Sequence, residues 1–215
     1  MQKLNFLKAL QSAGVIAVIR HDTKDGAIKA SEAVIAGGMK GIELTFTVPD
    51  ADQAIRELKE RYEGNPEIII GAGTVLEAFT ARLAILAGAQ FIVSPTFDLS
   101  TAEVCHLYQI PYLPGCMTIS EAQIALKAGV DIIKLFPGNL YGPAIIKAFK
   151  APVPHLNIMP TGGVDVDNLA EWFEAGAVAV GVGGNLLAPA KTNNFAKVTE
   201  NASVYMAKYQ QIKGE

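Results

Sequence analysis

Apolar residues gather in short runs along the chain, and each run precedes a longer segment in which apolar residues return every three or four positions. Short runs of Val, Ile and Leu indicate strands buried on both faces, and the longer spacing indicates amphipathic helices. The pattern predicts a first helix over residues 1–14. It then predicts eight strands, at residues 15–19, 41–46, 67–71, 91–93, 111–113, 131–136, 156–159 and 178–182. The helices that follow these strands cover residues 25–36, 50–62, 76–87, 100–108, 120–127 with Ser120 as cap, 142–150, 167–174 and 194–211.

Eight strands that alternate with helices in a chain of 215 residues are typical of a (β/α)8 barrel. No linker or low-complexity tract divides the chain, so we predict α/β class, a single-domain (β/α)8 TIM barrel over residues 1–215 with an extra N-terminal helix. The alternative is a doubly wound open sheet, which would need Gly-x-Gly-x-x-Gly after its first strand. The chain reads Arg20-His21-Asp22-Thr23 there, which favours the barrel.

A lysine interrupts the apolar run of the sixth strand. Lys134 lies between Ile133 and Leu135, and the run closes at Phe136 and Pro137. Two interpretations are open. Apolar walls can keep part of a lysine amine neutral, so that it attacks a carbonyl and forms a Schiff base. Alternatively, a buried lysine pairs with a carboxylate and has only a structural role.

Barrel enzymes carry their chemistry at the C-terminal ends of the strands. In the second strand Glu43, Thr45 and Thr47 share one face, and the apolar residues between them share the other. The apolar face suits the layer between strands and helices, so Glu43 should point into the barrel, and the same alternation directs Lys134 inward. We predict that the two side chains form either a silent ion pair or a nucleophile, Lys134, with its acid/base partner, Glu43.

Glycines cluster after the seventh and eighth strands. Gly162 and Gly163 follow the seventh strand, and Gly183 and Gly184 follow the eighth. Barrels bind phosphate on backbone N–H groups of these two loops, although glycine is also common in ordinary tight turns. Because both loops are rich in glycine, we predict a phosphate site.

Composition limits the possible partners. A formal net charge of −3 and the lack of a Lys/Arg-rich run argue against nucleic-acid binding. No segment offers ~18 uninterrupted apolar residues, so no membrane span is expected. Two cysteines without a secretion signal predict reduced thiols in a cytoplasmic protein, with Cys116 in a packing role. The three histidines lie far apart in the chain, and no metal site is predicted.

Six short motifs follow one another between about residues 15 and 187. Each motif alone is weak, but their order over nearly the whole chain is specific. Together they resemble the bacterial 2-keto-3-deoxy-6-phosphogluconate (KDPG) / 4-hydroxy-2-oxoglutarate (KHG) aldolases, a family of class I Schiff-base aldolases. The motifs are Glu43-Leu44-Thr45, Gly71-Ala72-Gly73-Thr74-Val75, Ser94-Pro95, Leu113-Pro114-Gly115, Lys134-Leu135-Phe136-Pro137-Gly138 and Pro160-Thr161-Gly162-Gly163-Val164.

The resemblance implies a lyase that cleaves KDPG to pyruvate and D-glyceraldehyde 3-phosphate in the Entner–Doudoroff pathway, without a metal or organic cofactor. It implies a barrel that is commonly a homotrimer. Lys134 would form the Schiff base with the 2-keto group, and Glu43 would act as general acid/base. The other positions that match substrate-binding residues are Thr47, Thr74, Pro95, Phe136, Thr161, Gly162, Gly163, Gly183 and Gly184.

Two positions depart from the best-known members of that family. Thr47 stands where they carry an arginine for the anionic substrate. Some members with Thr-Phe-Thr-Val-Pro-Asp in the second strand have an arginine at the end of the first strand instead. Arg20 occupies that place here, and we expect it to supply the missing charge. Gly184 stands where a serine is often found, which removes one hydroxyl but keeps the backbone N–H donors.

Several functions stay open at this point. KHG and 2-keto-3-deoxy-6-phosphogalactonate are alternative substrates for the same chemistry. A second hypothesis is a sugar-phosphate isomerase or epimerase in which Glu43 and Lys134 move protons without a covalent intermediate. A third is a sugar-phosphate sensor without turnover. Covalent trapping of pyruvate on Lys134, together with pyruvate release, separates an aldolase from both.

Overall fold

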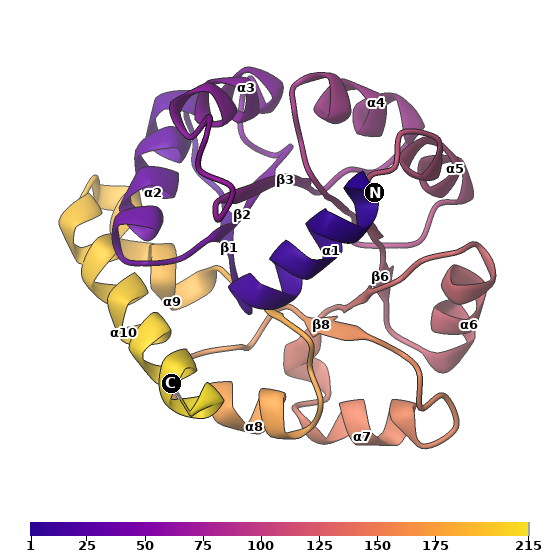
Figure 1. The fold of residues 1–215 in the computed structure, drawn as a ribbon. Helices are drawn as coiled ribbons and strands as arrows, with labels where there is room; N and C mark the ends of the chain where they lie inside the picture. The colour runs from indigo at the N-terminus through magenta and orange to yellow at the C-terminus, as the bar shows by residue number, and fades with distance from the viewer. Residues whose placement is uncertain (215) are drawn as a thin grey trace.

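The computed structural model describes residues 1–214 and alternates strands with helices along that length (Figure 1). The strands are β1 (Val15–Ile19), β2 (Gly41–Thr45), β3 (Ile69–Gly73), β4 (Ile92–Val93), β5 (Tyr112–Leu113), β6 (Gly115–Cys116), β7 (Ile133–Leu135), β8 (Ile158–Pro160) and β9 (Val180–Val182). The α-helices are α1 (Gln2–Ala13), α2 (Lys24–Ala36), α3 (Ala51–Arg61), α4 (Ala78–Leu86), α5 (Leu99–Leu107), α6 (Ile119–Lys127), α7 (Ala144–Lys150), α8 (Leu169–Glu174), α9 (Gly184–Leu187) and α10 (Phe195–Lys213). Two 3-10 helices complete the set, η1 (Gly138–Leu140) and η2 (Ala188–Thr192).

The strands pair in parallel throughout the described residues. One sheet has the order β5-β4-β3-β2-β1-β9, and a second has the order β6-β7-β8. The first sheet runs consecutively from β5 to β1, whereas a doubly wound sheet reverses its strand order. The chain therefore has an α/β fold built on a curved parallel half-barrel.

The strand predicted at residues 111–113 corresponds to β5, and the chain continues past it into a second short strand, β6. Pro114 separates β5 from β6, and proline has no N–H to donate to a neighbouring strand. β5 pairs with β4, and β6 pairs with β7, so this one stretch of chain links the two sheets. At the other end a parallel bridge joins Thr161, directly after β8, to Gly181 in β9.

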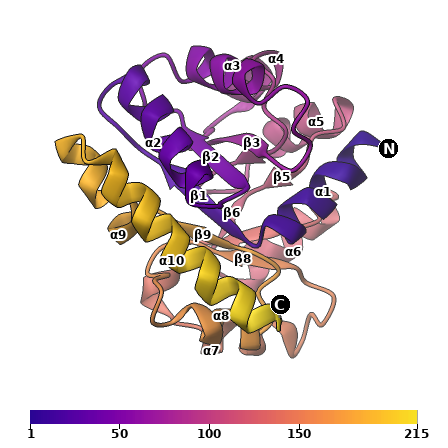
Figure 2. The same ribbon diagram turned by 60° about the vertical axis from the view of Figure 1, so that its left-hand side comes forward.

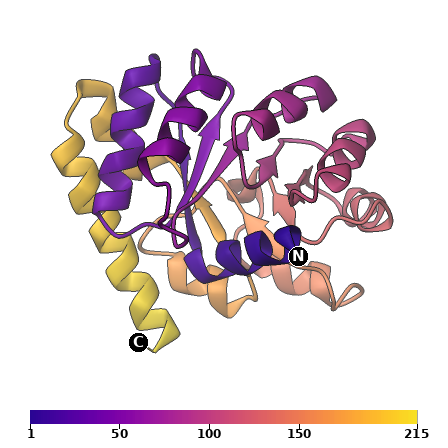
Figure 3. The same ribbon diagram turned by 45° about the horizontal axis from the view of Figure 1, so that its top comes forward.

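Two apolar clusters follow the predicted alternation of side chains. Ile133 and Leu135 belong to the large cluster between the strands and the outer helices. Ile132 belongs to a smaller cluster that the strands enclose. The helix α1 supplies Leu10 and Ala13 to this second cluster, and Figure 3 shows it lying across one end of the strands. The inner face of the strands is thus sealed by α1 at one end, which leaves the opposite end for polar side chains.

The last helix closes the ring of helices against the first βα unit. Figure 2 shows α10 lying beside α2. The Thr199 hydroxyl donates to the carbonyl oxygen of Ala33 at 2.9 Å, and a Cβ at Gly37 would lie 2.5 Å from the Ala202 side chain. Glycine at position 37 therefore permits the close approach of the two helices. No helix within residues 1–214 is long and apolar enough to cross a membrane.

One predicted helix cap was wrong. Ser120 was expected to cap the helix after the fifth strand, but the helix α6 begins one residue earlier, at Ile119, and its cap is Thr118. The Thr118 hydroxyl accepts from the backbone N–H of Glu121 at 3.2 Å, and the Glu121 carboxylate accepts from the backbone N–H of Thr118 at 2.8 Å. This reciprocal capping box satisfies two backbone donors at the start of α6.

Candidate active site

Lys134 and Glu43 meet in the interior between the two sheets. Lys134 lies in β7 and Glu43 in β2, and the distance from Lys134 Nζ to Glu43 Oε1 is 3.4 Å. The Lys134 side chain is 5% exposed and the Glu43 side chain is fully buried. Two opposite charges thus enter one interior from strands in different sheets, as the alternation predicted.

Backbone pairing fixes the position of each side chain. Lys134 pairs with Gly115 on one side and Met159 on the other, and its backbone N–H donates to the Pro114 carbonyl oxygen at 2.8 Å. Glu43 pairs with Gly71. A Cβ at Gly73 would lie 2.2 Å from Glu43 Oε1, so the absence of a side chain at position 73 makes room for the carboxylate.

Two buried oxygen atoms near this pair lack hydrogen-bond partners among the described residues. They are Glu43 Oε2 and Thr161 Oγ1. Buried polar atoms are usually paired, so an unpaired one often indicates a place where water or a ligand binds. Thr161 also has little room to turn away, because a Cβ at Gly181 would lie 2.3 Å from its Oγ1. Each of these two atoms is therefore available to form a hydrogen bond with water or with a polar ligand.

Phe136 lies directly beside the amine. The distance from Lys134 Nζ to the centre of the Phe136 ring is 5.1 Å, within the range of a cation–π contact. The loop after Phe136 is tied to the loop after β8, because the Gly138 N–H donates to the Thr161 carbonyl oxygen at 2.8 Å. Gly162 and Gly163 have φ angles of 92° and 75°, which other residues rarely adopt. The glycines of this loop are thus required by its backbone conformation.

A pocket of about 360 Å³ extends from Phe136 and Thr161 to the surface. Six of the predicted site residues line it, and it adds a cation that the sequence analysis missed. Lys191 stands on η2, beyond the last predicted strand, where neither strand alternation nor the family motifs gave a signal. The lining residues are Val18, Arg20, Phe136, Thr161, Gly162, Gly183, Gly184, Leu187, Ala188 and Lys191.

Six predicted residues do not line this pocket, namely the buried Lys134 and Glu43 and four residues near the strand ends, Thr47, Thr74, Pro95 and Gly163. Thr47 is exposed, and its hydroxyl oxygen lies 2.7 Å from that of Thr45, which donates to the Ile19 carbonyl oxygen. Thr74 has a left-handed φ of 56°, directly after β3. The other two pack against neighbouring loops. A Cβ at Gly115 would lie 1.9 Å from the Pro95 carbonyl oxygen, and a Cβ at Gly163 would lie 2.7 Å from Asn139 Cβ.

The cysteines show no feature of a nucleophile. Burial raises the pKa of Cys105 and of Cys116 to about 12, so both thiols are neutral at physiological pH. Cys116 is 1% exposed and its thiol lies 3.8 Å from the Pro114 carbonyl oxygen. The packing role predicted for Cys116 agrees with this placement. Within residues 1–214 no three His, Cys, Asp or Glu side chains are grouped as metal ligands would be.

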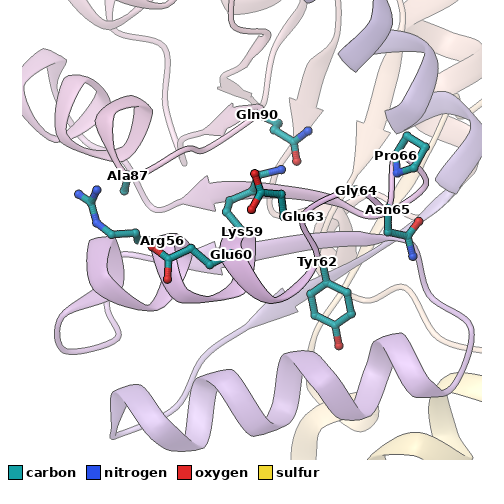
Figure 4. A pocket seen from close by; sticks show the side chains of 10 residues that line it. All are labelled: Arg56, Lys59, Glu60, Tyr62, Glu63, Gly64, Asn65, Pro66, Ala87 and Gln90. Atoms are coloured by element: carbon teal, nitrogen blue, oxygen red, sulfur yellow. The ribbon is translucent and has the colours of Figure 1, made fainter.

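A larger cavity of about 660 Å³ lies elsewhere, at the C-terminal end of α3 (Figure 4). Arg56, Lys59 and Glu60 of α3 line it together with residues 62–66, Ala87 and Gln90. Burial lowers the pKa of Lys59, and the nearby Glu63 carboxylate opposes that shift. None of the predicted site residues lines this cavity, so size alone does not identify the reactive centre.

Comparisons with known proteins give the family. A family model described as "KDPG and KHG aldolase" matches residues 7–201. The chain is 36% identical over 180 residues to a 2-dehydro-3-deoxy-phosphogluconate aldolase of Pseudomonas aeruginosa, covering 83% of this chain and 80% of that protein. It is 32% identical over 198 residues to a 2-dehydro-3-deoxy-6-phosphogalactonate aldolase of Escherichia coli, covering 92% and 95%.

A solved structure supports the same conclusion. The KDPG aldolase of Legionella pneumophila, in which pyruvate was captured at low pH as a covalent carbinolamine intermediate, superposes with a TM-score of 0.84. That match has 28% sequence identity and covers 95% of this chain and 98% of the other. With the family model spanning most of its length, the chain belongs to the KDPG and KHG aldolase family.

Proposed function

We propose that the protein is a class I aldolase that cleaves KDPG to pyruvate and D-glyceraldehyde 3-phosphate through a Schiff base on Lys134. The observation that carries this proposal is the buried pair, in which Lys134 Nζ lies 3.4 Å from Glu43 Oε1 beside a pocket that opens to the surface. Imine formation needs a nucleophilic amine and a group that carries protons. A lysine and a glutamate held together beside an open pocket supply both.

The first chemical step forms the Schiff base. Neutral Lys134 attacks the 2-keto carbon, and one proton passes from the lysine nitrogen to the former carbonyl oxygen to give a carbinolamine. Glu43 then donates a proton to the departing hydroxyl group, so that water leaves and an iminium remains on Lys134. The unpaired Oε2 of Glu43 is free to bind that water, while Oε1 stays beside the amine.

The second step breaks the bond between C3 and C4. A base removes the proton of the C4 hydroxyl, and the electron pair of the C3–C4 bond moves into the iminium. The aldehyde product, D-glyceraldehyde 3-phosphate, then leaves. The enamine that remains is protonated at C3, and water then releases pyruvate and restores the Lys134 amine. In our proposal Glu43 carries each of these protons, because it is the carboxylate beside Lys134 Nζ.

The remaining site residues would hold the two ends of the substrate. Thr74, Pro95 and Thr161 surround the pyruvyl end, and the unpaired hydroxyl of Thr161 supports this assignment. Phe136 packs beside the imine. The backbone N–H groups of Gly162, Gly163, Gly183 and Gly184 would receive the phosphate. The Thr47 hydroxyl hydrogen-bonds to that of Thr45, and threonine carries no charge. Arg20 would therefore supply the positive charge that binds the anionic substrate.

Arg20 provides the first test of substrate binding. Arg20 is exposed, lines the pocket and forms no ion pair with another described residue, so its loss should scarcely affect the fold. We expect Arg20→Ala to raise KM for the anionic substrate roughly 10-fold, because a charge-assisted hydrogen bond is lost. The thermal midpoint should stay near that of the wild type. Unchanged kinetics would assign the charge recognition to another residue.

A second candidate substrate is the stereoisomer 2-keto-3-deoxy-6-phosphogalactonate. The similarity to the Escherichia coli enzyme of that name, over 92% of this chain, favours keeping it beside KDPG. An assay that couples pyruvate release to lactate dehydrogenase, run with KDPG, its galactonate isomer and KHG, ranks the three by kcat/KM. The proposal requires pyruvate release from at least one of them, and an isomerase would release none.

We also propose the finer architecture. The linked β5 and β6 segments and the bridge at Thr161 support a closed eight-stranded barrel, with α1 as an additional helix, in one domain of residues 1–215. Residue 215 itself lies outside the described part.

Exposed apolar side chains at the starts of α4 and α5, Phe79 and Leu99, support self-association, and a homotrimer is our proposal. Sedimentation at the monomer mass would contradict it.

A further inference from the structure

Two cations line the pocket without partners of their own. Arg20 follows β1, and Lys191 stands on η2 near the end of the chain. Neither forms an ion pair with another residue in the described range 1–214, and neither the family motifs nor the strand pattern drew attention to Lys191. Side chains of like charge repel each other, so placing both on one pocket is favourable mainly when an anion lies between them.

A histidine connects the two segments that carry these cations. The backbone N–H of Thr23 donates to His21 Nδ1 at 3.2 Å, which leaves the ring proton on Nε2. His21 Nε2 lies 3.3 Å from the Ala190 carbonyl oxygen and donates to it. A Cβ at Gly26 would lie 2.0 Å from the ring, so the ring is closely enclosed. His21, which follows Arg20, is thus hydrogen-bonded to Ala190, which precedes Lys191.

The chemistry of the lining favours an anion at this end of the pocket. None of the residues that line it is acidic. Gly162, Gly183 and Gly184 present backbone along one side, and a Cβ at Gly184 would meet nothing within 4 Å, so the space beside it is open. Phe136, whose ring centre lies 5.1 Å from Lys134 Nζ, also lines the pocket. A substrate bound to Lys134 therefore has its far end among glycine backbone and two cations.

We propose that Lys191 is a specificity-determining residue, which with Arg20 makes the site select substrates that carry a terminal phosphate. This inference rests on the proposed aldolase function and adds the residue that recognises the phosphate. The loop after β9 carries Gly184, which has no hydroxyl to donate to a phosphate. Lys191, which lines the same pocket, supplies a positive charge there instead. A mobile ammonium on a long side chain suits a dianion that enters and leaves in each turnover.

The test compares a phosphorylated 2-keto-3-deoxy sugar acid with the same compound lacking the phosphate. For Lys191→Met we expect kcat/KM for the phosphorylated substrate to fall on the order of 10-fold or more, because an ionic hydrogen bond is lost. For the unphosphorylated substrate it should change less than about 2-fold. The matched control is Lys197→Met, which removes a lysine from α10 that pairs with Glu200 at 2.9 Å and should leave both values unchanged.

Two further measurements strengthen the test. Inorganic phosphate should inhibit the wild-type enzyme competitively, with a Ki that rises in Lys191→Met and returns toward the wild-type value in Lys191→Arg. Borohydride trapping of pyruvate on Lys134 should be equal in all of these variants. If trapping succeeds and Lys191→Met keeps the wild-type preference for the phosphorylated substrate, the inference about Lys191 alone is overturned. If the wild type traps no pyruvate, the aldolase function fails and this inference fails with it.

Discussion

Replacing Lys134 by methionine should abolish aldol cleavage, with kcat reduced by roughly 10⁴-fold or more. Methionine keeps the unbranched shape of the side chain in a position that is 5% exposed, but it has no amine to attack the 2-keto carbon. No other lysine is placed beside Glu43 within residues 1–214. Pyruvate release in the coupled assay measures the effect, and Lys197→Met serves as the control.

The same substitution also affects folding, and this effect has to be separated from catalysis. Without the Lys134 ammonium, the fully buried Glu43 carboxylate loses its partner at 3.4 Å. Leaving a buried charge unpaired costs about 3–5 kcal/mol. The double variant Lys134→Met with Glu43→Gln should therefore be more stable than Lys134→Met and equally inactive. Turnover by a folded Lys134→Met enzyme would show that another group is the nucleophile.

Replacing Glu43 by glutamine should lower kcat by roughly 10²-fold or more. Glutamine preserves the size of the side chain and can still accept a hydrogen bond from Lys134 Nζ, but it cannot carry a proton through the steps of imine formation and enamine protonation. The binding of pyruvate should change little, because the residues assigned to the pyruvyl end are untouched. Initial rates in the coupled assay, with KM measured separately, distinguish these two effects.

A matched control for this variant is Glu200→Gln, which removes an exposed carboxylate from α10. It should be fully active. If Glu43→Gln is also fully active, the proton carrier is a different group, and Glu43 is only the counter-charge of Lys134. The ion pair and the catalytic role are compatible, because a pair at 3.4 Å leaves Glu43 Oε2 without a partner and available to water or substrate.

The position of the Lys134–Glu43 ion pair could be predicted from the sequence because strand geometry determines it. Side chains in a strand alternate between two faces, so the apolar neighbours Ile133 and Leu135 required Lys134 to face inward. The same argument applied to Glu43 between Ile42 and Leu44. The alternation of side chains in β2 and in β7 turns Glu43 and Lys134 toward the same interior, and the two side chains therefore meet there.

Features that depend on contacts between distant segments could not be predicted in this way. The separation of β5 from β6 at Pro114 depends on the two strands pairing with different neighbours. The choice of Thr118 over Ser120 as a helix cap depends on which hydroxyl completes a capping box with Glu121. Lys191 lines the pocket because the short helices after β9 bring Ala190 to His21, which follows β1, and no periodic pattern marks such short helices.

Reduction with borohydride in the presence of pyruvate, followed by peptide mass analysis, shows directly whether Lys134 forms the Schiff base. A Schiff base between pyruvate and the enzyme becomes a stable secondary amine when it is reduced. We expect the mass of one reduced pyruvyl group on the peptide that contains Lys134, and none when Lys134 is replaced by methionine. An unmodified Lys134 peptide from the wild-type protein, or an adduct on a different lysine, would contradict the account.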